Sequence, residues 1–151
     1  MQKYNTQVLL GISDDQLLLL KTALFAPEEA IVYWQQWKKY WGFDKFDNDN
    51  IDFNIFNKID KESTRLLPLI YKNIEHSDDP LLPALRDIYR NTWMRNLQFL
   101  KKAQDIVKLC DDANIPTMLL KGLPMSLFYY KDMGVRPMGD VGGLSQASGP
   151  C

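Results

Sequence analysis

The sequence is poor in the residues that build disulfide frameworks and zinc sites. Its 151 residues include two cysteines, Cys110 and Cys151, and one histidine, His76. A disulfide framework needs more cysteines at closer spacing, and a zinc site built from cysteine and histidine needs ligands at recognisable spacings. We therefore expect both cysteines to be free thiols of a reducing compartment.

The chain also lacks an excess of positive charge and a long apolar run. It carries 18 Lys and Arg residues against 19 Asp and Glu residues, which leaves a formal net charge of −1. This balance offers no electrostatic surface for nucleic acid or for anionic membranes. No apolar stretch is long enough to span a bilayer, and the N-terminal residues do not have the pattern of a signal peptide. These absences predict a soluble, cytoplasmic protein with no nucleic-acid partner and no membrane association.

What the chain does have is a globular composition with strong helix signals. Hydrophobic residues make up 46% of it, which is enough to bury a core in a chain of this length. Ser13, followed three residues later by Gln16, forms a capping box that predicts a helix to about Phe25. Pro27 suits the first position of a second helix, with two glutamates in its first turn.

The second helix carries an aromatic face. Its large side chains recur every three or four residues, which places most of them on one side of the helix. They are Ile31, Tyr33, Trp34, Trp37, Tyr40 and Trp41. Such a face is typical of core packing, and an acidic chain gives the alternative, base stacking, little electrostatic support. We interpret this face as part of the core.

Two further segments precede the only histidine. Residues 51–59 fit both a strand and a helix, and the helical neighbourhood favours a helix. A helix is predicted for about residues 63–75, with Pro68 either in its first turn or kinking it. His76 should then face water, because no acid or nucleophile is paired with it in a recognisable pattern.

The longest predicted helix covers about residues 83–112. Its apolar stripe recurs at helical spacing: Leu85, Ile88, Tyr89, Thr92, Trp93, Leu97, Leu100, Ala103, Val107 and Cys110. Asn114 suits a left-handed turn at its end, and Pro116 prevents the helix from continuing. These signals predict a single long amphipathic helix.

The pattern then changes character. Residues 117–120 are a short apolar run typical of a buried strand, and Lys121 and Gly122 follow as a turn. A helix is predicted for residues 124–130, and residues 135–141 lead toward a second strand. The predicted order is therefore strand, glycine turn, helix, loop and strand.

The predicted fold class is mainly α. Residues 1–115 form an N-terminal helical bundle region, and residues 116–143 form a short, incomplete α/β element. Residues 144–151 are predicted to be a flexible tail, because glycine, serine and proline are poor strand residues.

A glycine turn between a strand and a helix can bind phosphate. Gly122 lets the backbone approach a ligand closely, and the start of the next helix offers unpaired N–H groups and the positive end of its dipole. Lys121 would add a positive charge. A simple tight turn explains the same two residues equally well.

Residues 118–140, MLLKGLPMSLFYYKDMGVRPMGD, resemble the opening of the catalytic core in a family of nucleotidyltransferase-fold proteins. The matching features are LLKG at 119–122, the helix with LFYY at 127–130, then Arg136 and Asp140. The preceding helices, including RLLPLIYKNI at 65–74, resemble the helical lead-in of that family. The resemblance covers most of the chain up to Val141, and it implies that the α/β element is the beginning of such a core.

This resemblance implies chemistry on a nucleoside triphosphate with Mg²⁺. Enzymes of this fold transfer a nucleoside monophosphate to a hydroxyl or phosphate acceptor. Two carboxylates one residue apart on a strand point the same way and hold Mg²⁺ against the triphosphate. Asp140 matches the first carboxylate, but Gly142 stands at the position of the second. No later strand remains to supply the further carboxylate that usually completes such a site.

The sequence therefore predicts the front part of a transferase, interrupted inside its metal-binding strand and not competent in catalysis alone. A frameshift, a recombination junction or an artificially added tail would each produce this pattern. Asp140 would hold Mg²⁺ weakly, and Lys121, Gly122 and Arg136 would retain weak nucleotide binding. In the simpler interpretation, Asp140 is a surface acid in a turn and Arg136 is a solvated residue.

Two alternative functions remain open. One is an active enzyme that uses carboxylates from a second subunit or from elsewhere in the chain; the nearest group, Asp44, Asp47, Asp49 and Asp52, is more typical of a solvated loop. The other is an interaction module that self-associates. An unpaired strand at residues 117–120 would expose an edge, and the aromatic helix face offers apolar surface, so a homo-oligomer is expected.

Overall fold

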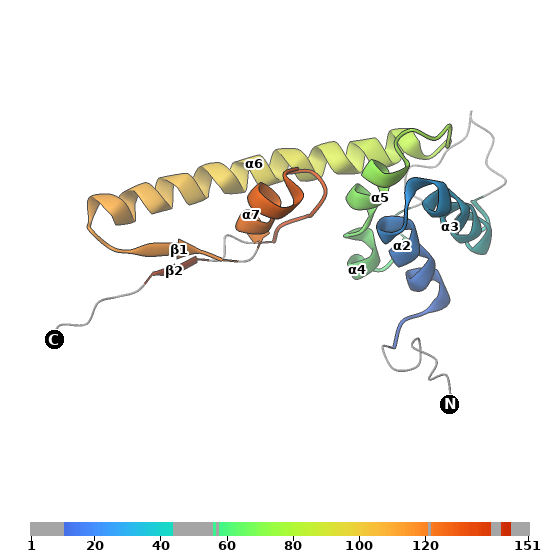
Figure 1. Ribbon diagram of the computed structural model, residues 1–151, viewed down its shortest axis with the longest axis horizontal. Coiled ribbons are helices and arrows are strands. Elements are labelled where there is room, and N and C mark those ends of the chain that lie inside the picture. The colour runs from blue at the N-terminus through green and yellow to red at the C-terminus, as the bar shows by residue number, and fades with distance from the viewer. Residues whose placement is uncertain (1–10, 44–55, 57, 121, 140–142, 146–151) are drawn as a thin grey trace. The chain divides into compact units, whose positions relative to one another are not determined.

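A computed structural model describes residues 11–43, 56, 58–120, 122–139 and 143–145 (Figure 1). The chain forms two compact units, Met1–Asp87 and Ile88–Cys151, which divide inside the longest helix. Helices make up most of the described elements, and each of the two strands has three residues. The prediction of a mainly α fold with a short α/β element is therefore confirmed. Among the described helices, none combines the length and apolarity that a bilayer span requires.

The first unit begins with two helices that start where the sequence predicts. Helix α2 covers Asp14–Leu24, and helix α3 covers Pro27–Tyr40. The backbone N–H of Ser13 donates to Oε1 of Gln16 at 3.2 Å, as a capping box requires.

The helix predicted for residues 63–75 is two helices. Helix α4 covers Lys61–Thr64 and helix α5 covers Leu67–Ile74. Pro68 lies in the first turn of α5, and it has no N–H to donate to the carbonyl of Thr64, so α4 cannot continue through it. Asp60 caps α4 by accepting the backbone N–H groups of Glu62 at 3.0 Å and Ser63 at 2.9 Å.

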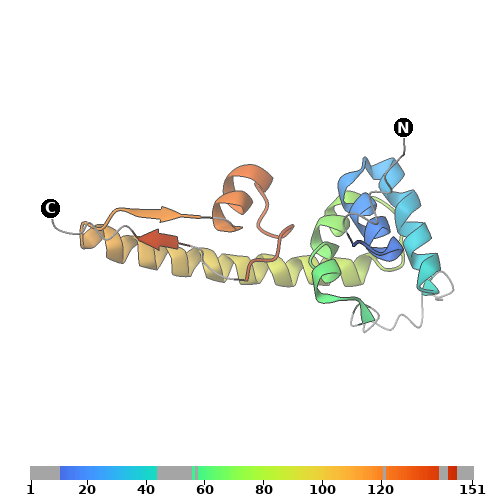
Figure 2. The same ribbon diagram turned by 90° about the horizontal axis from the view of Figure 1, so that it is seen from below.

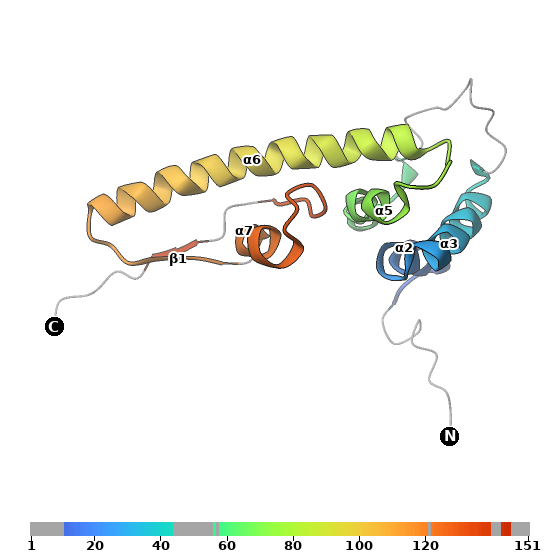
Figure 3. The same cartoon turned by 45° about the horizontal axis from the view of Figure 1, so that its top comes forward.

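The core of the first unit lies where α2, α3 and α5 contact one another (Figure 3). Trp34 and Trp37 are fully buried, and their rings stack with centroids 4.9 Å apart. Leu19 of α2 and Ile70 of α5 are equally buried. The interpretation of the aromatic face as core is confirmed for these two tryptophans, whereas Tyr40 at the end of α3 is exposed.

A buried ion pair joins α3 to the start of the longest helix. Lys38 donates to a carboxylate oxygen of Asp79 at 2.5 Å, and both side chains are almost completely buried. Gln35 also donates to Asp79, at 3.2 Å, while the N–H of Leu81 donates to the other carboxylate oxygen. Since each charge is paired and hydrogen-bonded, the desolvation of the pair is compensated.

The longest helix, α6, covers Leu82–Asp112, one residue from the predicted start. Asn114 has the expected left-handed backbone, with φ of 55°. The chain then turns into strand β1, Thr117–Leu119. Both the long helix and its end are therefore as the sequence predicts.

In the second unit a helix follows β1 and precedes β2 along the chain, while the two strands lie side by side (Figure 2). Helix α7, Gly122–Pro124, begins two residues before the predicted start and continues as the π-helical turn η3, Met125–Tyr130. Lys131 ends it in the left-handed region, with φ of 53°.

The second strand lies later than the sequence suggests. Residues 133–136 form bends, and β2 covers Gly143–Ser145, which pairs antiparallel with β1 in the register that makes Met118 and Leu144 backbone partners. Two residues assigned to the tail thus belong to a strand, because hydrogen bonding to a neighbouring strand outweighs their low strand propensity. The expectation that residues 117–120 form an unpaired strand is therefore wrong for the edge that β2 covers.

Candidate functional site

The structure describes two of the four predicted site residues, Gly122 and Arg136. Lys121 and Asp140 lie outside the described residues, and so does Gly142. The acidic group of residues 44–52 also lies outside them. The site can therefore be built from β1, the helix that follows it, and the loop of residues 131–139.

Gly122 is pressed against the loop that leads to Asp140. A Cβ atom at this position would lie 3.2 Å from Cγ and 3.3 Å from Sδ of Met138. These distances are tighter than ordinary van der Waals contact, so a larger residue would push the Met138 side chain away. The glycine thus brings the start of α7 against the segment that follows Arg136.

A small apolar core holds these two segments together. Ala103 of α6, Leu123 of α7 and Met138 of the loop are buried in one cluster. Partly buried side chains pack around it: Phe99, Leu100, Leu119 and Met133. The helix start and the loop are therefore fixed on the same side of α6 by apolar burial.

The loop is also clamped by a polar side chain, Asn96 of α6, which is fully buried. Its amide nitrogen donates to the carbonyls of Met133 at 2.6 Å and Arg136 at 2.8 Å. Its amide oxygen accepts the N–H of Met138 at 3.2 Å. Three hydrogen bonds from one side chain therefore satisfy a stretch of backbone that belongs to no helix or strand.

A second contact between α6 and the loop involves Tyr89. Its hydroxyl donates to the carboxylate of Asp132 at 2.8 Å, and the N–H of Gly134 donates to the same carboxylate at 2.7 Å. The Tyr89 ring also lies directly on Gly134, where a Cβ atom would be 2.2 Å from a ring carbon. Position 134 therefore requires glycine.

Sequence reasoning missed Asn96, Asp132 and Gly134 as contributors to this region. A signal for Asn96 was present, because it lies at helical spacing between Thr92 and Leu100 on the apolar stripe of the long helix. A buried polar side chain on such a stripe must find partners, and here the partners are loop carbonyls. The pairing of Tyr89 with Asp132 joins residues far apart in the chain, so no local sequence pattern predicts it.

The described residues do not assemble a metal site. No group of three or more His, Cys, Asp or Glu side chains that could hold a metal ion occurs in the described part of the chain. Asp132, the described acid of the loop, already accepts hydrogen bonds from Tyr89 and Gly134. His76 is 91% exposed, as predicted, and lies 3.9 Å from the Glu75 carboxylate.

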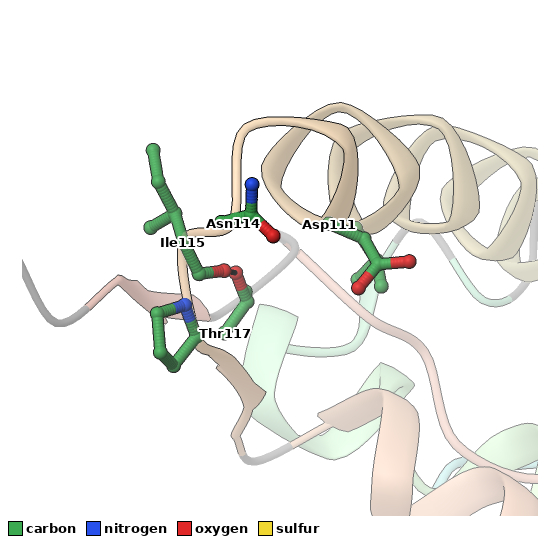
Figure 4. Close-up of a pocket in the computed structure, with 6 residues that line it drawn as sticks. Asp111, Asn114, Ile115 and Thr117 are labelled. Atoms are coloured by element: carbon green, nitrogen blue, oxygen red, sulfur yellow. Dashed lines mark hydrogen bonds between the residues drawn. The ribbon is translucent and has the colours of Figure 1, made fainter.

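Two hollows lie beside α6 in the second unit. One, of about 300 Å³, is at the end of the helix, where Figure 4 shows Asp111 on the last turn and Thr117 beyond the turn of Asn114 and Ile115. The other, of about 390 Å³, is a mainly apolar groove that includes Leu119 of β1 among its lining residues. Neither is lined by Gly122 or Arg136, so neither coincides with the predicted phosphate site.

The chain belongs to a family of uncharacterised nucleotidyltransferases. The model of that family matches residues 62–142, which is more than half of the chain. The match runs from α4 to the position of Gly142 and includes Asn96, Gly122 and Arg136. Comparisons with curated proteins and with solved structures gave no match.

Proposed function

We propose that this protein binds a nucleoside triphosphate, together with its Mg²⁺ ion, on the surface formed by the start of α7 and the loop that carries Arg136. Lys121, Gly122 and Arg136 would contact the phosphates, and Asp140 would contact the metal ion weakly. Binding, rather than efficient nucleotidyl transfer, would be the activity of this chain by itself. The observation that carries the proposal is the packing of Gly122 against the loop, inside the region that the family model matches.

The start of α7 supports a phosphate contact. The N–H groups of Gly122 and Leu123, the first two residues of α7, have no partner within the helix, whereas Pro124 has no N–H. Gly122 follows β1 closely, so these N–H groups are presented at the end of a strand. Lys121 immediately precedes them in the sequence and would add a full positive charge.

Arg136 supports a second phosphate contact. Arginine presents its donors in a planar fork that matches two phosphate oxygens at once. Asn96 holds the carbonyl of Arg136, and Met138 two residues later packs against Gly122. The loop backbone beside the arginine is therefore fixed relative to the helix start.

Efficient catalysis is not part of the proposal, because the predicted site has too few carboxylates to bind Mg²⁺ tightly. Gly142 stands where the resemblance places the second metal ligand, and glycine has no side chain to bind Mg²⁺. Positioning of the metal and the phosphates supplies most of the rate enhancement in phosphoryl transfer. The metal ion would therefore arrive with the triphosphate rather than be held by a complete protein site.

A thermal shift titration tests this function directly. Mg²⁺ with each of ATP, GTP, CTP and UTP should raise the melting temperature, by roughly 5–10 °C when the ligand is at about 100 times its Kd. Arg136→Ala and Lys121→Ala should each reduce the shift, and Asp140→Ala should reduce its dependence on Mg²⁺. Lys102→Ala removes an exposed positive charge from α6 and should leave the shift unchanged.

Two results would contradict the proposal. A melting temperature that no triphosphate changes would exclude nucleotide binding. Rapid pyrophosphate release in the same samples would instead favour the alternative of an active enzyme, completed by carboxylates from a second subunit or from residues 44–52.

A second candidate function, self-association, is favoured by exposed apolar side chains of the second unit. Phe128 and Tyr129 of η3 are 77% and 72% exposed, and Met118 of β1 is 64% exposed. Large exposed apolar side chains are typical of interaction surfaces. We propose that these residues contact a second copy of the chain, which light scattering at high micromolar concentration would detect as a doubled mass.

A further inference from the structure

We infer that Asn96 is the positioning residue of the proposed nucleotide site. Through its three hydrogen bonds it would hold the loop of residues 133–138 in the conformation that binds phosphate, without contacting the nucleotide itself. This inference rests on the proposed function, because a positioned loop matters to affinity only where a ligand uses it.

The hydrogen bonds of Asn96 reach the backbone of Arg136 and of residues on both sides of it. The two donated bonds end on the carbonyls of Met133 and Arg136, and the accepted bond comes from the N–H of Met138. The clamp therefore includes the backbone on both sides of the arginine and ends two residues before Asp140. One buried amide therefore holds the backbone that carries Arg136.

No other described element offers these backbone groups a partner of the same kind. Residues 133–136 form bends, and residues 137–139 belong to no helix or strand. A loop without regular hydrogen bonding has many conformations, and ordering it on ligand binding costs conformational entropy. Asn96 would order the loop when the protein folds, so that ligand binding would not have to order it.

The first unit contains a similar contact that serves as a control. It distinguishes an effect on protein stability from an effect on the position of the loop. Asn73 of α5 also donates two hydrogen bonds to carbonyls, those of Thr22 at 2.7 Å and Phe25 at 2.8 Å. These carbonyls lie at the end of α2, far from the predicted phosphate contacts in sequence and in the other compact unit. Asn73→Ala thus removes the same kind of clamp without touching the loop.

The experiment compares Asn96→Ala with Asn73→Ala in full-length protein. Titration calorimetry with Mg²⁺ and each of the four common nucleoside triphosphates gives Kd, and thermal melts give stability. We expect Asn96→Ala to raise Kd by about tenfold or more, because small displacements of positioning groups have large effects, whereas Asn73→Ala should leave Kd within about twofold of wild type. Asn96→Ser, which keeps one hydroxyl donor, serves if the alanine variant does not fold.

Amide hydrogen exchange adds a measurement that a purely global loss of stability would not reproduce. The N–H of Met138 should exchange faster in the Asn96 variants than in Asn73→Ala at matched stability, since Asn96 is its acceptor. Saturating nucleotide should restore part of the protection in the Asn96 variants, because the ligand then orders the loop.

The outcomes of the two proposals can be told apart. If wild type binds nucleotide, Arg136→Ala binds weakly and the Asn96 variants bind normally, the positioning role is wrong and the proposed function stands. If wild type binds no nucleotide, the proposed function is wrong and the positioning role falls with it. If both asparagine variants weaken binding equally, Asn96 contributes only stability, and the inference is wrong.

Discussion

The two compact units bury their side chains in different ways. The first unit, Met1–Asp87, has a core of fully buried large residues from three helices, with Trp34 stacked on Trp37. In the described part of the second unit, Ile88–Cys151, a buried apolar cluster has three residues, and large apolar side chains such as Phe128 are exposed.

Their polar side chains also serve different segments. In the first unit, Asn73 and Asp60 complete helix ends, which are regular structures that need only a few extra partners. In the second unit, Asn96 and Asp132 organise an irregular loop. Loops held by rigid elements commonly carry binding sites, which agrees with our proposal of a site in the second unit.

The largest expected loss of stability is in the first unit. Asp79→Ala should lower the free energy of unfolding by about 3–5 kcal/mol, because it leaves the buried ammonium of Lys38 without its partner. Urea unfolding followed by tryptophan fluorescence measures this loss. A Trp93→Phe background removes the tryptophan of the second unit, so that the signal comes from Trp34, Trp37 and Trp41. Asp78→Ala, at the exposed neighbouring position, is the control, and an equal loss in both variants would contradict the role of the ion pair.

A smaller effect is expected from the second unit. Gly134→Ala should cost about 1–3 kcal/mol, because the new Cβ atom meets the ring of Tyr89. Gly139→Ala is the control, since a Cβ atom there meets nothing within 4 Å. Thermal melts of both variants, of Tyr89→Leu, and of Gly134→Ala combined with Tyr89→Leu measure the coupling. Additive effects of the two changes would show that the close approach is not what requires glycine.

Asp60 should give a still smaller effect that depends on pH. A hydrogen bond from the Ser63 side chain, followed by one from the Ser63 backbone, lowers the pKa of Asp60 below its ordinary value of 3.8. Since the folded pKa is the lower one, the contribution of this carboxylate is complete above pH 3.8 and is lost as the pH falls through the folded pKa. Asp60→Ala should cost about 1 kcal/mol at neutral pH, typical of an N-cap.

Denaturation at neutral pH and at acidic pH checks the dependence. The difference in stability between wild type and Asp60→Ala should shrink in acid, because the wild-type carboxylate is then protonated. A difference that stays constant below the ordinary pKa of aspartate would mean that the cap does not act through its charge.

The smallest effect on stability is expected at the exposed surface of the second unit. Phe128→Ser should change the free energy of unfolding by less than about 0.5 kcal/mol, because the side chain is largely in water. It should nevertheless reduce the self-associated fraction in light scattering. Leu24→Ser removes a comparably exposed apolar side chain, 72% exposed, from the first unit and should leave the mass unchanged. Equal masses for wild type and both variants would contradict the proposed surface.

Local patterns predicted most helix boundaries well. The capping box at Ser13, the proline at position 27 and the left-handed Asn114 each act through neighbouring residues, so their effects can be read from the sequence. The split between α4 and α5 was harder, because Pro68 fits either a first turn or a kink. The placement of β2 at Gly143–Ser145 was not predicted, since the pairing with β1 overrides residue preference.

The sequence by itself determined the helical class, the long amphipathic helix, the family motif and the absence of a carboxylate at position 142. These properties depend on residue identity or on spacing within one element. Only the tertiary structure decided that Met138 packs on Gly122, that the Tyr89 ring requires glycine at position 134, and that Asn96 clamps the loop around Arg136. Those contacts join residues separated by many positions in the chain, and each exists only because packing on α6 brings the partners together.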